Sequence, residues 1–463
     1  MKQKWLVMMI SLVGLVLSML ARPAAAALED TLYEKGIITK EEWLKAKAEA
    51  EKAMGPVEKL DDWQKKVSKL PILSDKFNIG ANVLQVQYLA NQADGTPGTS
   101  DNRFFIRRAE LITWGKVNDY WPRWHMLFDF AANSNIGRSS GLNSISTSGT
   151  ATDNNQIIRE AYVDIVPSLS AQPYVDRFRI GQYRIPVGIE GSTSSGLIDF
   201  INRNYITAAP GASTGGFTGT AAAGTLGGGT IDFIQERDVY VDLKSKPLEQ
   251  LELDLGIMNG NGINGPGTAF DNNSQKDFFG RARVKPRKDL FFSMGTIQGE
   301  STNLNSRNGG RGKGNYDRYI ADFQWRPEFI PGFWLQGEYA WGHDAPPAAS
   351  LALDAVTTGR GEVRRAWYVY GKYLIQSGPL KDFEVLARYE QFDPSSNVSQ
   401  DMMDRTTVGI NYYFANLPPR IQAKFMINYE FRHRDGFGPG TKVNKLDEFG
   451  NDALLIQLHV RWF

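Results

Sequence analysis

The chain has 463 residues, no cysteine, and 52 basic against 51 acidic side chains, which leaves a net charge of +1. This balance gives no electrostatic basis for binding nucleic acid or for a strongly one-signed pore. Without cysteine the chain has no disulfides, no thiolate metal ligands and no CxxCH haem attachment of its own.

The N-terminus has the three parts of a secretory signal peptide. Two lysines precede an apolar run over 5–20, and alanines follow at 24–27. The apolar run is short for a membrane span, and no stop-transfer flank follows it. We therefore expect residues 1–27 to be a signal peptide that is cleaved after Ala26 or Ala27.

Residues 28–76 differ in composition from the rest, being rich in Lys, Glu and Ala, and the pattern predicts helices. Thr39 begins one helix, with Glu42 three residues later as a capping box, and Gly55-Pro56 ends it. Apolar residues then recur at heptad-like spacing: Val57, Leu60, Trp63, Val67 and Leu70. Two interpretations remain open: a solvated periplasmic extension and linker, or an oligomerisation or cell-wall contact.

From residue 77 to residue 463, apolar and polar residues alternate along about sixteen segments, and a period of two predicts β-strands. Near the C-terminus, for example, Phe425 and Ile427 fall on one face, and Lys424 and Asn428 fall on the other. A soluble sandwich buries its apolar face, whereas a membrane barrel turns that face to lipid and its polar face to a wet lumen. The alternation by itself fits both folds.

The lengths of the joins between these segments distinguish the two folds. Tight joins such as Lys246-Pro247 and Pro418-Pro419 alternate with long ones at 132–155, 258–275, 298–315, 342–363 and 432–451. All long loops then fall at one end of the sheet and all turns at the other, as in outer-membrane barrels. The predicted fold is all-β, a transmembrane antiparallel β-barrel of about 16 strands over 77–463.

The longest join, 188–236, is a candidate constriction loop. A connection of this length is usually functional or disordered, and a wide barrel leaves an aqueous channel that a loop can narrow. Apolar residues between 188 and 205 favour packing against the barrel wall, whereas the Gly-, Ala- and Thr-rich part at 211–229 fits a disordered external loop. We predict an inward fold, with Glu190, Asp199 and Arg203 as the charged residues of the constriction.

The alternation also predicts which charged side chains line the lumen. For the strand near 174–187 the assignment requires a bulge at Gly181. Clustered cations would give a local anion preference, whereas opposite charges that lie on opposite walls and pair across strands would give a transverse field without strong selectivity. The basic candidates are Arg108, Arg177, Arg179, Arg184, Arg281, Arg283 and Lys285, and the acidic ones are Asp129, Glu160 and Asp164.

No pattern for catalysis, metal binding or a cofactor stands out. The four histidines are scattered without the spacing of metal ligands. The hydroxyl cluster at 192–195 lacks the Gly-x-Ser-x-Gly elbow of a nucleophilic serine. We therefore expect a protein that is not an enzyme and that carries no metal and no cofactor.

Three stretches resemble the phosphate-selective porin O and P family: Phe105-Ile106-Arg107-Arg108-Ala109, Phe128-Asp129-Phe130-Ala131, and Ile180 to Glu190 with its Gly-Gln-x-x-x-Pro-x-Gly pattern. The resemblance covers about residues 77–463. It implies a sixteen-stranded, trimeric outer-membrane channel whose third loop folds into the pore. Phosphate-selective members carry lysines in that loop, whereas Arg203 is the one basic residue of 188–236 here.

The leading hypothesis is a porin in the outer membrane of a Gram-negative-type bacterium, a homotrimer in contact with lipid, with its N-terminal segment in the periplasm. Small hydrophilic or anionic solutes would diffuse passively through it. Alternatively, the barrel is a sheath around a partner such as a multihaem cytochrome that carries electrons across the membrane; a barrel without an inward loop would favour this. A third hypothesis is adhesion or cell-wall anchoring through residues 28–70.

Overall fold

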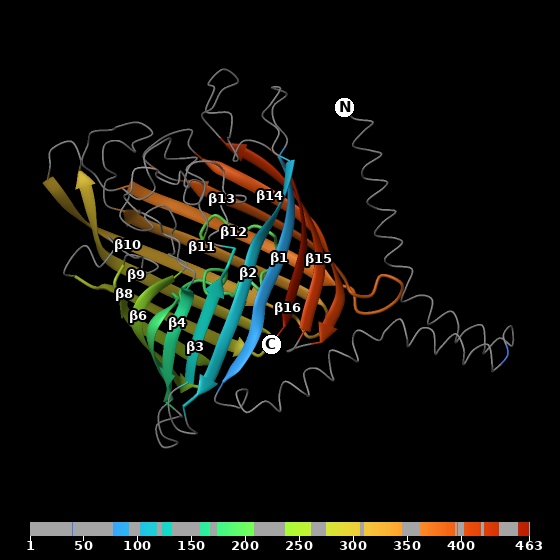
Figure 1. Ribbon diagram of the computed structural model, residues 1–463. Coiled ribbons are helices and arrows are strands. Elements are labelled where there is room, and N and C mark those ends of the chain that lie inside the picture. Colours follow the sequence, from blue (N-terminus) through green and yellow to red (C-terminus); the bar gives the residue numbers. More distant parts are fainter. Residues whose placement is uncertain are drawn as a thin grey trace, which may run out of the picture. The chain divides into compact units, whose positions relative to one another are not determined.

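The computed structural model describes Thr39 and the ranges 77–91, 102–117, 123–131, 158–166, 174–207, 237–260, 275–305, 310–344, 362–393, 396, 402–417, 421–434 and 452–462. The predicted signal peptide and, apart from Thr39, the predicted helical extension lie outside these residues. The chain divides into two units, Met1–Ser74 and Asp75–Phe463, and every strand among the described residues belongs to the second (Figure 1). The described residues include no helix that is long and apolar enough to cross a membrane.

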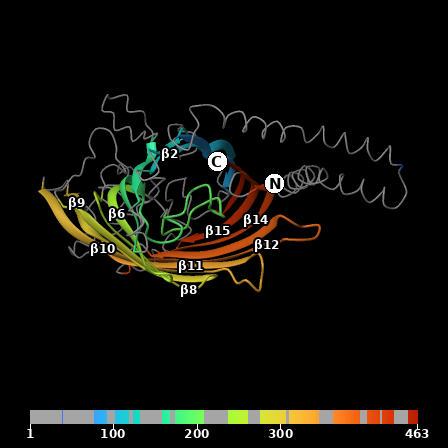
Figure 2. The ribbon, with the colours of Figure 1, turned by 90° about the horizontal axis from the view of Figure 1, so that it is seen from below.

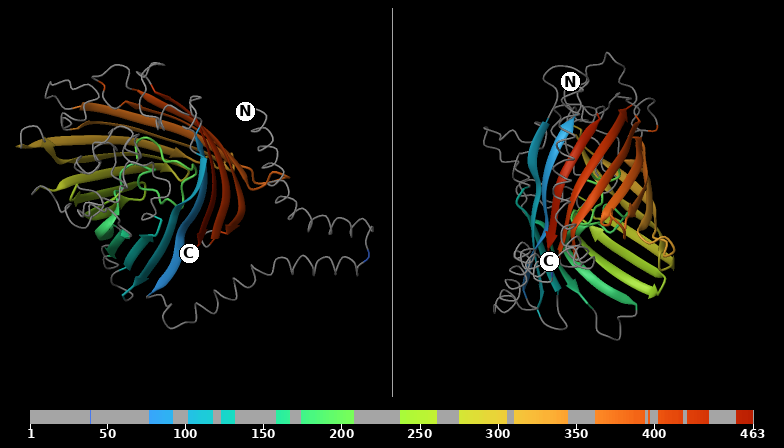
Figure 3. Two further views of the ribbon diagram at one scale, coloured as in Figure 1. Left: turned by 45° about the horizontal axis from the view of Figure 1, so that its top comes forward. Right: turned by 90° about the vertical axis from the view of Figure 1, so that its right-hand side faces the viewer.

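Sixteen antiparallel strands each pair with their neighbours in sequence, and β1 pairs with β16 to close a barrel, as predicted (Figures 1 and 3). The strands are β1 (Asn78–Asn91), β2 (Asn102–Lys116), β3 (Arg123–Asp129), β4 (Ile158–Ile165), β5 (Val175–Arg184), β6 (Arg237–Leu248), β7 (Leu251–Met258), β8 (Asp277–Arg287), β9 (Leu290–Asn305), β10 (Gly310–Trp325), β11 (Phe333–Asp344), β12 (Glu362–Leu374), β13 (Phe383–Asp393), β14 (Met403–Leu417), β15 (Ile421–Arg434) and β16 (Ala453–Trp462).

Burial along the strands is inverted relative to a soluble protein. In β15 the polar side chains Lys424, Asn428 and Glu430 are 0–1% exposed, whereas Phe431 is 50% exposed. Alternate residues of a strand point to opposite faces, so the apolar face of the closed sheet points outward and the polar face inward. This inversion is the arrangement of a membrane barrel and excludes the soluble sandwich.

Loop length follows the predicted parity with one exception. The joins after even-numbered strands are short, such as 249–250 and 288–289, and most joins after odd-numbered strands are longer. We call the two ends of the barrel the turn end and the loop end. The prediction of a long loop at 298–315 was wrong, because β9 and β10 continue through it as a paired hairpin up to Asn305↔Gly310.

The predicted bulge at Gly181 is absent. Both ladders pass through this residue without a shift of register, Gly181 pairing with Tyr162 on one side and Tyr240 on the other. Gly181 instead has a φ of 134°, a conformation that residues with a side chain rarely adopt. A single glycine therefore changes the direction of the backbone where the sequence suggested an extra residue.

A Gly181→Ala variant is expected to lose about 1–3 kcal/mol of stability through backbone strain. The added Cβ would also lie 2.7 Å from the Cα of Tyr162. Gly371→Ala in β12 is the matched control, since its Cβ would meet nothing closer than 3.8 Å. Thermal unfolding in detergent tests this, and equal melting temperatures for the two variants would contradict it.

Candidate functional site: a loop across the lumen

The chain enters the barrel directly after β5. Residues 185–207 lie inside the ring of strands (Figure 2). Ile185 and Val187 are fully buried and belong to one apolar cluster with Phe279 of β8 and Ile297 of β9. The first part of the loop is thus attached to the wall by packing of apolar side chains.

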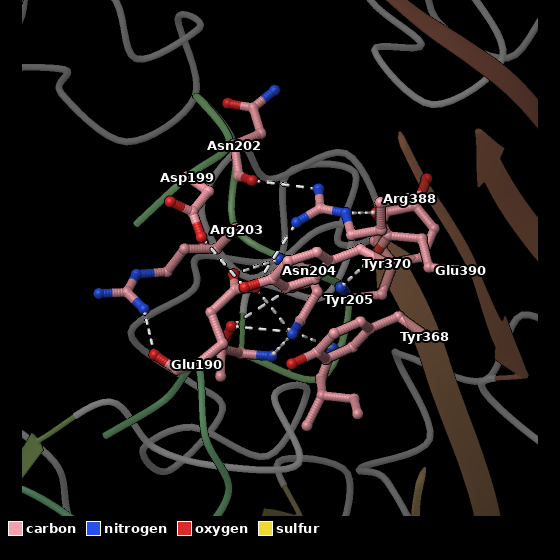
Figure 4. Close-up of polar contacts among 12 residues, drawn as sticks. Glu190, Asp199, Asn202, Arg203, Asn204, Tyr205, Tyr368, Tyr370, Arg388 and Glu390 are labelled. Atoms are coloured by element: carbon pink, nitrogen blue, oxygen red, sulfur yellow. Dashed lines mark hydrogen bonds and ion pairs between the residues drawn. The ribbon is translucent and has the colours of Figure 1, made fainter. Parts of the chain in front are cut away.

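Two carboxylates of the wall accept hydrogen bonds from the loop backbone, and Figure 4 shows one of them, Glu390, near Tyr205 of the loop. Glu338 of β11 accepts from the amides of Ile189 at 3.0 Å and Glu190 at 2.8 Å. Glu390 of β13 accepts from the amide of Tyr205 at 2.7 Å. Buried backbone amides need such partners, so these carboxylates fix both limbs of the loop.

Side chains of β13 to β15 bind the loop between these two points. Lys424 donates to the carbonyl of Ile198 at 2.9 Å, and Arg405 donates to that of Arg203 at 2.6 Å. The amide of Ile201 donates to Asn428 at 2.8 Å, and Arg388 donates to the carbonyl of Asn202 at 3.1 Å. The loop therefore has one defined path along this wall.

The loop also reaches β1 and β16, where the barrel closes. His459, which is fully buried, hydrogen-bonds through Nε2 to the carbonyl of Gly196 at 3.2 Å. A Cβ on Gly196 would lie 2.6 Å from the carbonyl oxygen of Asn82, so only glycine permits this close approach. The described loop thus contacts the wall from β11 round to β1.

The three predicted loop residues bind protein groups. Glu190 accepts from the amide of Asn204 at 2.7 Å, and its burial raises its pKa. Arg203 donates to the carbonyls of Glu190 at 2.6 Å and Thr193 at 3.0 Å. These two side chains hold the loop in shape, and the third, Asp199, holds it against the wall.

Asp199 is the third of these residues. Its carboxylate pairs with Lys372 of β12 at 2.7 Å and accepts from the hydroxyl of Tyr370 at 3.1 Å. Burial alone would raise its pKa, but Lys372 and Lys424 outweigh burial and lower it. The loop is therefore held here by an ion pair.

The candidate arginines of β5 pair with carboxylates on adjacent strands. Arg177 lies 3.1 Å from Asp242 of β6, and Arg179 lies 2.7 Å from Asp164 of β4. Arg184 lies 2.9 Å from Glu160 of β4 and donates to the carbonyl of Thr193 at 2.8 Å. Arg184 thus fixes the point where the chain turns into the lumen.

The candidates of β8 also pair with carboxylates of the wall. Arg283 and Lys285 both pair with Glu252 of the adjacent strand β7, at 3.3 and 2.5 Å, and Arg281 reaches past β9 to Asp322 of β10 at 2.9 Å. These ion pairs agree with the predicted alternative in that the opposite charges pair across strands, and the predicted distribution of charge between opposite walls stays a prediction. Same-face residues on adjacent strands are only about 5 Å apart, so they pair along the wall.

Arg108 and Asp129 complete the predicted set. Arg108 lies 3.6 Å from Glu110 and donates to Gln85 at 2.8 Å. Asp129 accepts from the amides of Ala109 and Ala131, at 3.3 and 3.1 Å, at the loop end of β3. Asp129 therefore has a structural contact of its own with the backbone.

In most of these wall pairs the cationic side chain is more exposed than its carboxylate. The pairs Arg179–Asp164 and Arg184–Glu160 are the reverse, at 8 and 14% and at 1 and 4% exposure, and Arg281–Asp322 is buried on both sides, at 2 and 0%. In the other four pairs the cationic side chain is 15–38% exposed and the carboxylate 0–8%: Arg108–Glu110, Arg177–Asp242, Arg283–Glu252 and Lys285–Glu252. A solute that passes these pairs meets positive charge first.

Sequence reasoning missed the anchoring role of the wall residues. Glu338, Glu390 and Lys424 fall on the inward face by alternation, but no pattern in the sequence links them to the loop. Within the described ranges, His, Cys, Asp and Glu form no group of three or more that could hold a metal ion.

The family model described as phosphate-selective porin O and P matches residues 77–230 and 335–462, which is more than half of the chain. The chain belongs to this family. It is an outer-membrane porin, a channel for passive diffusion, and its family and fold are those of non-enzymatic channels. No curated protein sequence is detectably similar to it.

Solved porins share the fold of this porin at low sequence identity. An anion-selective porin from Comamonas acidovorans is 12% identical, with a TM-score of 0.50 and coverage of 84% of this chain and 99% of that one. OprB of Pseudomonas putida is 10% identical, with a TM-score of 0.51 and coverage of 87 and 97%. OmpF of Salmonella typhi, in complex with daunomycin, is 12% identical, with a TM-score of 0.50 and coverage of 83 and 97%.

Proposed function

We propose that this porin conducts small hydrophilic anions in preference to cations, through the part of the lumen that the 185–207 loop leaves open. The observation that carries this is the unequal exposure of the wall pairs, in which Arg177, Arg283 and Lys285 protrude beyond their carboxylates. Fixed cations in a pore wall favour anions. The similarity to a porin that is called anion-selective agrees with this.

The proposal includes the remaining sequence-based expectations. The turn end faces the periplasm with residues 28–76, the barrel lies in lipid as a homotrimer, and the protein catalyses no reaction. Phosphate as a specific substrate is left out, because the charged loop residues Glu190, Asp199 and Arg203 already bind protein groups. The loop inside the lumen also argues against a sheath for a partner protein, since it takes up space that a partner would need.

Reversing two cations tests the charge preference. In a salt gradient across a planar bilayer, the wild-type reversal potential should have the sign of anion preference. Arg283→Glu with Lys285→Glu should lower the anion-to-cation permeability ratio by at least about fivefold, because the exchange changes four unit charges and a single unit charge at 4 Å in water contributes about 1 kcal/mol.

The control for this experiment makes the same charge change on the turns. Lys288 and Lys381 are exposed turn residues, and replacing both with glutamate should leave the permeability ratio near that of the wild type. Equal shifts in the two double variants would refute the assignment to the wall, and a wild-type reversal potential of cationic sign would refute the proposed function.

A further inference from the structure

At the turn end of the lumen, the Arg326 side chain forms no direct ion pair with the described residues, and Asp199 acts on it only as a nearby negative charge. Arg326 follows β10 directly, and its guanidinium lies 3.3 Å from the ring centroid of Trp334 of β11. Its side chain is exposed and forms no hydrogen bond or ion pair with the residues that the structure describes. Lys372, 4.3 Å from the same ring, is by contrast bound to Asp199 and Glu384.

The position of Arg326 is fixed by the backbone around it. Its amide donates to the carbonyl of Asp289 at 2.8 Å, in the neighbouring turn. Gly332, with a φ of 90°, accepts at 2.9 Å from the amide of Leu374 of β12. The β10–β11 turn is thus bound to the β8–β9 turn and to the end of β12, and the stacked pair of Arg326 and Trp334 is held in place before any solute arrives.

A second stacked cation lies along the same inner face. Arg283 of β8 lies 4.7 Å from the ring centroid of Phe291 of β9, and Phe291 pairs in register with Gln324 of β10. Gln324 is buried on the inward face and donates to Gln336 of β11, two residues from Trp334, so Trp334 and the Arg326 guanidinium over its ring lie on that face too. Adjacent strands are about 4.8 Å apart, so β8 to β11 bring these groups within about 15 Å of one another.

We propose that this turn-end patch, made of Arg283, Lys285, Phe291, Arg326 and Trp334, binds aromatic carboxylates during passage. A guanidinium stacked on one ring keeps its opposite face and its edge donors free, and a planar π-system stacks well on that face. The carboxylate group of the solute would bind the cations of the patch, and the aromatic ring of the solute would stack on the guanidinium plane. An inorganic anion would interact only with the positive charges of the patch.

This inference rests on the proposed anion preference and adds a solute class to it. The test uses two acids of equal charge and similar size, benzoate and cyclohexanecarboxylate, as blockers of chloride current through the full chain in a planar bilayer. Benzoate should block at a concentration about threefold to tenfold lower, the range that a partly desolvated cation–π contact gives.

Two conservative variants assign this difference to the patch. Arg326→Lys keeps the charge without the plane, and Trp334→Leu keeps an apolar side chain without the ring; each should make the two acids block equally. Trp334→Phe should retain part of the difference, and it keeps the test valid if the leucine variant does not insert. Chloride conductance of each variant reports folding.

The outcomes separate the two proposals. Equal block by the two acids in a wild-type channel that still prefers chloride over potassium would overturn the patch and leave the proposed function intact. A wild-type channel without anion preference would overturn the proposed function itself. An unchanged benzoate preference in both Arg326→Lys and Trp334→Leu would show that the acid binds elsewhere.

Discussion

A Glu390→Ala variant is expected to conduct more current per channel than the wild type and to be less stable. The Glu390 carboxylate is fully buried, accepts from the amide of Tyr205 at 2.7 Å, and pairs with Arg388 at 3.0 Å and Arg405 at 2.7 Å. Removing one partner of such a buried group leaves uncompensated charge, at a cost of about 3–5 kcal/mol. Without this anchor the second limb of the loop should move away from the wall and open the lumen.

Single-channel conductance and thermal unfolding measure the two effects of the Glu390 variant. Glu328→Ala is the control, because Glu328 is an exposed residue of the β10–β11 turn. We expect this control to match the wild type in both measurements. If Glu390→Ala is destabilised but its conductance steps and their noise are unchanged, the loop does not narrow the channel.

A Glu160→Ala variant is expected to show the largest loss of stability on the opposite wall, again about 3–5 kcal/mol. The Glu160 carboxylate is the shared partner of Arg184 at 2.9 Å, Arg237 at 3.0 Å and His125 at 3.1 Å. Both arginine side chains are 1% exposed. The variant would leave two buried cations together without their carboxylate: Arg184 at the end of β5 and Arg237 at the start of β6.

The control for Glu160 is an exposed ion pair on β5 and β6, the strands that carry its partners Arg184 and Arg237. Asp176 and Lys246 lie 3.7 Å apart, and their side chains are 42 and 45% exposed. Such a pair contributes about 0–1 kcal/mol, so Asp176→Ala should barely change the melting temperature. A small and equal change in both variants would contradict the role given to Glu160.

The strands could be predicted because their signal is local. Alternation over β15 places Lys424 and Asn428 on the polar face, and the structure buries both in the lumen. The same rule failed at β9 and β10, where the sequence from Asn305 to Gly314 is polar and glycine-rich without a period of two. There the pairing of two already formed strands extends the hairpin against low local propensity.

The site could be predicted only in outline. The length of the 188–236 join and its apolar first part indicated an inward fold, and residues 185–207 do lie inside the barrel, while 208–236 are outside the described residues. The anchors were not predictable, because a pair such as Tyr205 and Glu390 is 185 residues apart in the chain. Such contacts follow from barrel closure and have no signature in sequence spacing.

The role of Arg184 shows the same limit. Alternation predicts an inward arginine, and a free inward arginine would set ion selectivity. In the structure its side chain pairs with Glu160 and donates a hydrogen bond to the carbonyl of Thr193. Its charge is therefore compensated, and its effect on transport should come through the position of the loop.

The central claim is an open channel that the 185–207 loop narrows. Single-channel recording of the purified full chain in a planar bilayer tests it most directly. We predict discrete, stable current steps of uniform size in the wild type, and larger or noisier steps in Glu390→Ala. Folded, membrane-inserted protein that gives no current steps would contradict an open channel and would favour a barrel that is plugged or filled by a partner.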